Sequence, residues 1–162
     1  MYKTKRFGFK FQTDRNMALK ILILHSLDDI PEVKSFLQQI KGILCDCRVD
    51  VILSDDDKNL GELDEIVKDV HVVFVFLTET FCTRDWKRYS SAACVRSMLV
   101  RDGPATLVPI FTVKRSQATF TVPLGLNCLQ GLRYCDQDQF YRNSVRQTLT
   151  GIIEENQLGS VS

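Results

Sequence analysis

Apolar and polar positions alternate along the chain in a regular way from residue 18 onward. Short runs rich in branched residues are separated by longer segments whose apolar residues recur every three or four positions. Short runs that are apolar throughout are typical of parallel strands covered on both faces, whereas the wider spacing is typical of helices. The expected strands are Leu19–Leu24, Val49–Leu53, Val70–Leu77, Thr106–Val113 and a brief last one at Leu132–Tyr134.

The segments between these runs predict helices. Pro31 suits the first turn of a helix, and the apolar face of that helix would contain Val33, Phe36, Leu37, Ile40 and Leu44. Residues 59–62 have the spacing of a capping box at the start of a second helix. Thr78–Val100 is expected to be mostly helical, in two pieces around residues 84–86, and Asp138–Glu155 is expected to form a closing helix.

Strand and helix alternate five times, which favours right-handed crossovers and a parallel sheet. The sequence therefore predicts an α/β domain with a flavodoxin-like three-layer αβα architecture and a central, mostly parallel five-stranded sheet. Val70–Leu77 is expected at the sheet centre, while Pro109 indicates an edge strand or a bulge. The expected domain covers residues 17–157, between a basic and aromatic tail (1–16) and a frayed carboxyl end (158–162).

Composition and charge narrow the function. The chain has 162 residues, 44% of them hydrophobic, and 21 basic side chains against 20 acidic ones leave a net charge of +1. Such a balance argues against nucleic acid as a partner, because no global positive field would hold a phosphate backbone. The longest apolar run is too short to span a bilayer and no signal peptide is recognisable. We therefore expect a cytoplasmic protein whose six cysteines are reduced thiols.

The amino-terminal tail is the exception to this even charge. Phenylalanines alternate there with basic residues, a pattern that fits a loosely ordered tail, a short edge strand or an arm that faces lipid. Membrane contact is therefore expected only through this tail. Its candidate contact residues are Lys3, Lys5, Arg6 and Lys10.

The sequence contains few patterns typical of catalytic, metal-binding or phosphate-binding sites. Asp28 and Asp29 follow the first strand like the acidic pair of a phospho-acceptor receiver, but the third strand ends in Leu77-Thr78-Glu79 without an acceptor Asp. The cysteines have no C-x-x-C spacing, the two histidines lie in apolar strands, and no glycine-rich phosphate loop is present. Cys82 and Cys94 are expected to be buried rather than nucleophilic. No metal and no cofactor are expected.

Four segments in order carry a resemblance to a known family. They read ILILHSLDD from Ile21, VDVILSDDD from Val49, VFVFLTETF from Val73 with Trp86 after it, and LVPIFTV from Leu107. The chain resembles a TIR (Toll/interleukin-1 receptor) domain over residues 18–155, and is most similar to the TRIF and TRAM type of Toll-like receptor adaptor. The resemblance implies a non-enzymatic signalling scaffold of innate immunity whose partners are TIR domains of receptors or adaptors, or further copies of itself.

The family also implies where partners bind. One surface is the BB loop after the second strand, which here comprises Ser54, Asp55, Asp56, Asp57, Lys58, Asn59, Leu60 and Gly61. The other is the helix after the third strand, represented by Thr83, Arg84, Trp86 and Lys87. The usual Pro-Gly of the BB loop is missing, and three adjacent carboxylates stand in its place. Such carboxylates favour a basic partner patch.

Some TIR domains cleave NAD, and the resemblance implies where the catalytic glutamate would lie. The corresponding segment is Trp86-Lys87-Arg88-Tyr89-Ser90, so the carboxylate position is occupied by Ser90. A hydroxyl cannot stabilise an oxocarbenium-like centre as a carboxylate does, and only a different helix register would bring Asp85 or Glu79 into that role. We therefore expect no enzyme activity. The alternatives are an NAD-cleaving enzyme, or a minimal decoy that blocks adaptor assembly.

Overall fold

The computed structural model describes residues 18–54 and 62–161, and these form an α/β fold around a parallel sheet. The strands are β1 (Leu19–Leu24), β2 (Val49–Leu53), β3 (Val72–Leu77) and β4 (Thr106–Phe111). Every pairing is parallel and the order is β2-β1-β3-β4. The two interior strands are β3, which is apolar throughout, and β1, which is apolar except for Lys20. The interior position expected for the third strand is confirmed.

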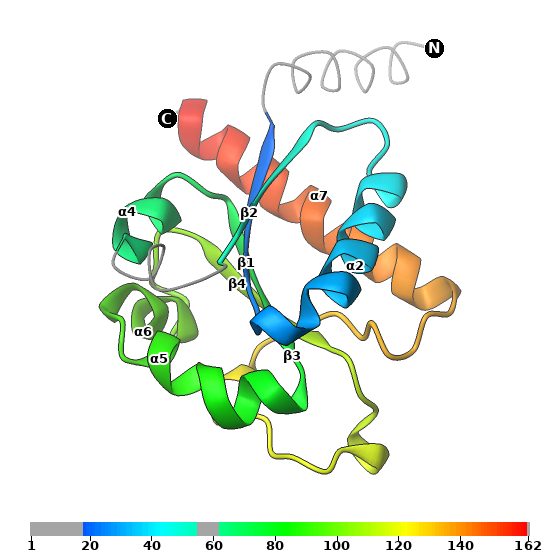
Figure 1. The fold of residues 1–162 in the computed structure, drawn as a ribbon. Coiled ribbons are helices and arrows are strands. Elements are labelled where there is room, and N and C mark those ends of the chain that lie inside the picture. Colours follow the sequence, from blue (N-terminus) through cyan, green and yellow to red (C-terminus); the bar gives the residue numbers. More distant parts are fainter. Residues whose placement is uncertain (1–17, 55–61, 162) are drawn as a thin grey trace.

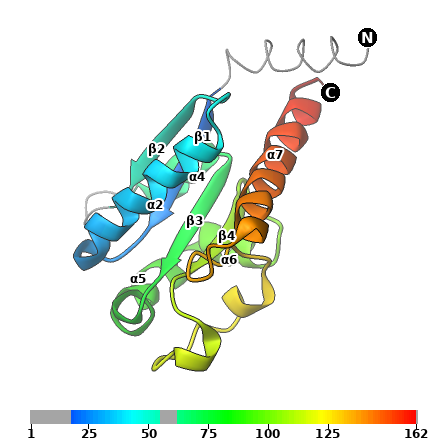
Figure 2. The same cartoon turned by 90° about the vertical axis from the view of Figure 1, so that its right-hand side faces the viewer.

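The helices separate into two groups on the two faces of the sheet (Figures 1 and 2). One face carries α2 (Ile30–Ile43) and α7 (Gln139–Val161), and the other carries α4 (Leu63–Lys68), α5 (Trp86–Ser90) and α6 (Ala93–Leu99). Side chains of β3 alternate between the two hydrophobic clusters: Phe74 and Phe76 belong to the first, Val73 and Val75 to the second. Both faces of β3 are thus buried, which explains its uninterrupted apolar sequence.

Helix α2 begins as the sequence predicts. Pro31 lies in the first turn, where its missing N–H costs no intrahelical hydrogen bond, and Val33, Phe36 and Ile40 have no exposed surface. Across the face, the hydroxyl of Tyr141 on α7 donates to the side chain of Gln39 at 2.7 Å. This contact links α2 to the last helix.

The segment after β3 forms two helical pieces, as expected, but they divide at different residues. A π-helical turn, η2 (Phe81–Asp85), leads directly into α5, and the break falls at residues 91–92 instead of 84–86. Trp86 stands at the junction of the two helical types, with its ring 6.3 Å from that of Phe81. The wider π turn leaves α5 only five residues long.

The expected fifth strand is wrong in the part of the chain that the structure describes. Leu132 makes only an isolated parallel bridge to Ile110. Its N–H donates to the carbonyl of Pro109 at 2.9 Å, and its carbonyl accepts from Phe111 N–H at 2.8 Å. On the amino-terminal side of this bridge, the next rung would need an N–H on Pro109, which proline lacks. Pairing therefore cannot extend from the bridge toward residue 130, consistent with the edge position expected for Pro109. On the other side, Cys135 N–H donates to the carbonyl of Phe111 at 3.0 Å.

Candidate functional site at the carboxyl ends of the strands

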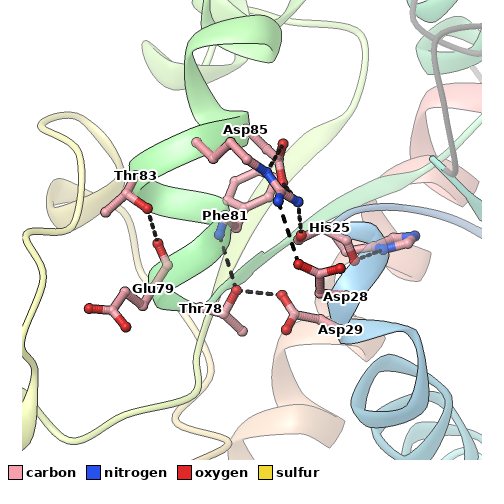
Figure 3. A network of polar contacts seen from close by, with 10 residues as sticks. His25, Asp28, Asp29, Thr78, Glu79, Phe81, Thr83 and Asp85 are labelled. Carbon is pink, nitrogen blue, oxygen red and sulfur yellow. Dashed lines mark hydrogen bonds and ion pairs between the residues drawn. The ribbon is translucent and has the colours of Figure 1, made fainter.

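Polar residues gather where three neighbouring parallel strands end (Figure 3). His25 and Ser26 follow β1, Ser54 follows β2, and Thr78 follows β3. Because the strands are parallel, their carboxyl ends lie at one edge of the sheet, where α/β folds commonly place their functional loops. These side chains therefore meet at the carboxyl edge of the sheet.

Thr78 connects the ends of β1 and β3. Its hydroxyl donates to Asp29 Oδ2 at 2.5 Å and accepts the backbone N–H of Phe81 at 3.2 Å. Asp29 precedes α2 and Phe81 begins η2. A single hydroxyl thereby joins the starts of two helical segments and satisfies one of the otherwise unpaired N–H groups of the second.

Arg84 makes a second connection at the same edge. One guanidinium nitrogen donates to the hydroxyl of Ser26 at 2.9 Å, and Nε donates to Asp85 Oδ1 at 3.2 Å. A weaker ion pair joins Arg84 to Asp28 at 3.5 Å, and both side chains of this pair are largely exposed, so it contributes little. The hydrogen bond and charge of Asp85 raise the pKa of Arg84, which further favours the charged form of this guanidinium.

Ser54 is the described root of the loop after β2. Its hydroxyl accepts the backbone N–H of His25 at 3.3 Å and the phenolic O–H of Tyr89 at 3.1 Å. Its own N–H donates to the carbonyl of Ile23 at 3.0 Å. Ser54 and Tyr89 are both buried. The point at which the chain leaves β2 is therefore held from β1 on one side and from α5 on the other.

His25 lies at the centre of this edge with one ring nitrogen unpaired. Nδ1 is 2.7 Å from the carbonyl oxygen of Ser26, and because a carbonyl only accepts, Nδ1 carries the proton. In the neutral imidazole Nε2 is then an acceptor, and among residues 18–54 and 62–161 it has no hydrogen-bond partner although His25 is only 2% exposed. Leaving a buried acceptor unpaired costs free energy, so the ring is held by the Nδ1 hydrogen bond and by the packing around it.

Removing the Tyr89 hydroxyl tests whether this joint is a stable part of the fold. We expect Tyr89→Phe to lower the free energy of unfolding by about 0.5–1.5 kcal/mol, since a buried hydrogen bond to Ser54 is lost. Urea denaturation followed by circular dichroism measures the change. Tyr134→Phe is the matched control, because no hydrogen bond of its hydroxyl is recorded and its ring packs against Phe36. Equal losses in the two variants would contradict a specific role for the Tyr89 contact.

The structure brings together only part of the expected interaction residues. Thr83, Arg84, Trp86 and Lys87 all lie on η2 and α5, with Lys87 exposed and Trp86 half-buried. The rest of the expected BB loop, namely Asp55, Asp56, Asp57, Lys58, Asn59, Leu60 and Gly61, lies outside the described residues. So do the candidate membrane contacts Lys3, Lys5, Arg6 and Lys10.

The positions considered for NAD cleavage are each engaged in local hydrogen bonds. The hydroxyl of Ser90 donates to the carbonyl of Lys87 at 3.2 Å. Asp85 is 8% exposed and holds Arg84. Glu79 accepts a hydrogen bond from the Thr119 hydroxyl at 3.1 Å. None of these contacts sets up a free carboxylate at the end of α5.

Metal and thiol chemistry gain no support from the part of the chain that the structure describes. No group of three His, Cys, Asp or Glu side chains there is arranged to hold a metal ion. Burial raises the pKa of Cys82 to about 12, and burial together with a hydrogen bond to Asp64 raises that of Cys94 to about 12. Both thiols are therefore protonated near neutral pH and poor nucleophiles.

Several residues of this edge were not anticipated as partners. Tyr89 occurs in the sequence only as part of a helical segment, and its contact with Ser54 spans 35 residues. The sequence does indicate a site position for Thr78 and Ser26, because each follows closely after an apolar run whose strand ends at the functional edge.

Comparisons with known proteins identify no relative: no family model matches the chain, and neither a curated protein nor a solved structure shows significant similarity to it. Within residues 18–54 and 62–161, no helix combines the length and apolar character needed to cross a membrane.

Proposed function

We propose that this chain is a non-enzymatic interaction domain that binds TIR domains of receptors or adaptors, including further copies of itself, in cytoplasmic signalling of the Toll-like receptor type. Two observations support the family assignment. The resemblance extends over residues 18–155, and the strand order β2-β1-β3-β4 matches the first four strands of the flavodoxin-like order 2-1-3-4-5. Fold alone implies no function, so the proposal depends on the edge described above.

The observation that carries the proposal is the joint at Ser54. The root of the loop after β2 is held by hydrogen bonds from His25 and Tyr89, while Arg84 ties the same helical segment to Ser26. The two surfaces that TIR domains use, the loop after the second strand and the helix after the third, thus begin from one hydrogen-bonded unit. Preorganisation of this kind reduces the ordering cost of binding.

Charge defines the kind of contact this unit can make. Arg84 and Lys87 are exposed on η2 and α5, and Asp55, Asp56 and Asp57 follow Ser54 in the sequence. Carboxylates on one copy and cations on another are complementary, and such pairs contribute mainly association rate and specificity. We therefore propose that the acidic segment of one TIR domain docks on the basic η2–α5 surface of the next.

Sedimentation velocity over a wide concentration range tests this arrangement. The variants are a triple Asp55, Asp56 and Asp57 to Ala change and a single Lys87→Glu change. Either one is expected to weaken self-association about tenfold at low salt, and high salt is expected to weaken the wild type because exposed charges are screened. Arg142→Glu is the matched control, since Arg142 is an exposed cation on α7, which covers the other face of the sheet from α5.

Two results would contradict the proposal. Association that is weakened equally by Lys87→Glu and Arg142→Glu would show a general charge effect and no specific surface. Release of nicotinamide from NAD in proportion to protein concentration, lost on changing Glu79 or Asp85, would show an enzyme. Inhibition of signalling by the isolated chain, with self-association intact, would assign it the decoy role within the same binding function.

A further inference from the structure

A second concave site lies at the carboxyl end of β4, away from the joint at Ser54. It is a cavity of about 280 Å³ whose lining includes Lys114, Arg115 and Arg133. The lining contains no carboxylate. Figure 2 shows the segment that follows β4, coloured yellow-green, folding below the carboxyl end of the strand. The cavity thus lies at the same functional edge of the sheet, at the ends of β3 and β4.

The fold brings its cations together from two separate segments. Thr112 follows β4 and donates its hydroxyl to the carbonyl of Leu77 at 2.6 Å, which fixes the chain just before Lys114 and Arg115. Arg133 arrives from the other side, directly after Leu132 has bridged to β4. The backbone N–H of Cys135 then donates to the carbonyl of Phe111 at 3.0 Å. Both sides of the cavity are therefore anchored to the strand end.

These three charges have no recorded counterion among the residues that the structure describes. No ion pair or side-chain hydrogen bond involves Lys114, Arg115 or Arg133. The sequence reinforces this, because it contains no Asp or Glu between Asp102 and Asp136. Glu79 accepts a hydrogen bond from the Thr119 hydroxyl within this segment, but it is not part of the lining.

Part of the cavity lining is apolar. It comprises the side chains of Leu77, Phe111, Phe120 and Val122, and Leu77 is only 1% exposed. A cavity lined by both apolar side chains and several cations suits a ligand with two parts, an anionic group and a compact apolar body. A volume of about 280 Å³ is at the small end for ligand pockets.

We propose that this cavity binds a small organic phosphate, with the phosphate group between Lys114, Arg115 and Arg133 and an apolar or aromatic carrier against Phe111 and Phe120. Phosphate is favoured over carboxylate because a dianion can engage three cations at once, and arginine matches phosphate oxygens with paired donors. The site shares no residue with the η2–α5 surface and is independent of the interaction function.

Titration of the ¹⁵N-labelled full chain by NMR tests the assignment, with phenyl phosphate, inorganic phosphate and phenol as three separate probes. We expect saturable shifts from phenyl phosphate at residues 112–122 and 127–135. Inorganic phosphate and phenol should each bind at least about tenfold more weakly, because each supplies only one part of the ligand. Arg133→Ala and Arg115→Ala should each weaken phenyl phosphate binding about tenfold, the usual size of a lost charged hydrogen bond.

Arg142→Ala is the control, since it removes one exposed cation on α7 outside the cavity, and it should change the affinity less than twofold. The amide spectra themselves report whether each variant is folded. The proposal is overturned by three results: no saturable binding, equal weakening by Arg133→Ala and Arg142→Ala, or equal affinity for phenyl phosphate and inorganic phosphate. The last would show a site for a simple anion without a carrier.

Discussion

Replacing Phe36 by alanine is expected to lower the free energy of unfolding by about 3–5 kcal/mol. Phe36 has no exposed surface and its ring lies 5.4 Å from Phe74, 5.8 Å from Phe76 and 5.3 Å from Tyr134. The ring therefore holds together α2, the central strand and the segment after Leu132. Alanine would leave a cavity bordered by three aromatic rings that cannot all move inward.

Phe140→Ala is the matched control for this prediction. Phe140 lies at the start of α7 and is 70% exposed, so the same chemical change should alter stability by less than about 0.5 kcal/mol. Urea unfolding followed by circular dichroism gives both values, and an unchanged dependence on urea would show that the unfolded states are comparable. A small effect of Phe36→Ala, similar to that of the control, would mean that α2 does not pack on the sheet as described.

Replacing Gly131 by alanine is the second large effect, with an expected loss of about 1–3 kcal/mol from overpacking. A Cβ at this position would lie 2.4 Å from the carbonyl oxygen of Pro109 and 2.6 Å from the ring of Phe111. The first of these is backbone in β4 and cannot rotate away. Leu132, which follows Gly131, would therefore be displaced from its bridge to Ile110.

Gly151→Ala is expected to change the free energy of unfolding in the opposite direction. A Cβ at Gly151, within α7, would have no heavy atom within 4 Å, so alanine should stabilise the helix by about 0.5–1 kcal/mol. Thermal or urea unfolding of the two variants separates the two effects: a steric clash of the added Cβ with β4 at position 131, and the higher helix propensity of alanine at position 151. Stabilisation by Gly131→Ala would disprove the close approach to β4. Because Arg133 directly follows Leu132, Gly131→Ala should also weaken phenyl phosphate binding in the NMR titration.

Much of the fold follows from local pattern. The apolar runs at β1 and β3 are long enough, and continuous enough, to specify strands covered on both sides, and the structure places both inside the sheet. Pro31 and the three-to-four spacing after it specify the start and the buried face of α2. These features depend on residues close together in the chain, and they can therefore be derived without knowing what packs against them.

The local pattern indicates where the candidate site lies, but not which side chains contact one another there. The carboxyl ends of the strands are marked by Ser26, Ser54 and Thr78, each close after an apolar run. Their partners are not marked: Tyr89 reaches Ser54 across 35 residues, and Thr78 reaches Asp29 across 49. The lining of the second cavity is not marked either, since it joins Lys114 to Arg133, which directly follows the Leu132 bridge to β4.

The sequence by itself therefore determined the fold class, the interior strands and the edge of the sheet at which polar residues collect. Tertiary structure decided how the sheet ends and which side chains meet. Pro109 has no N–H with which to extend pairing from Leu132 back toward residue 130, and Gly131 allows the backbone to approach β4 closely. Hydrogen bonds and charge clusters between distant residues depend on where the elements pack, and hydrophobic periodicity records only which face of each element is buried.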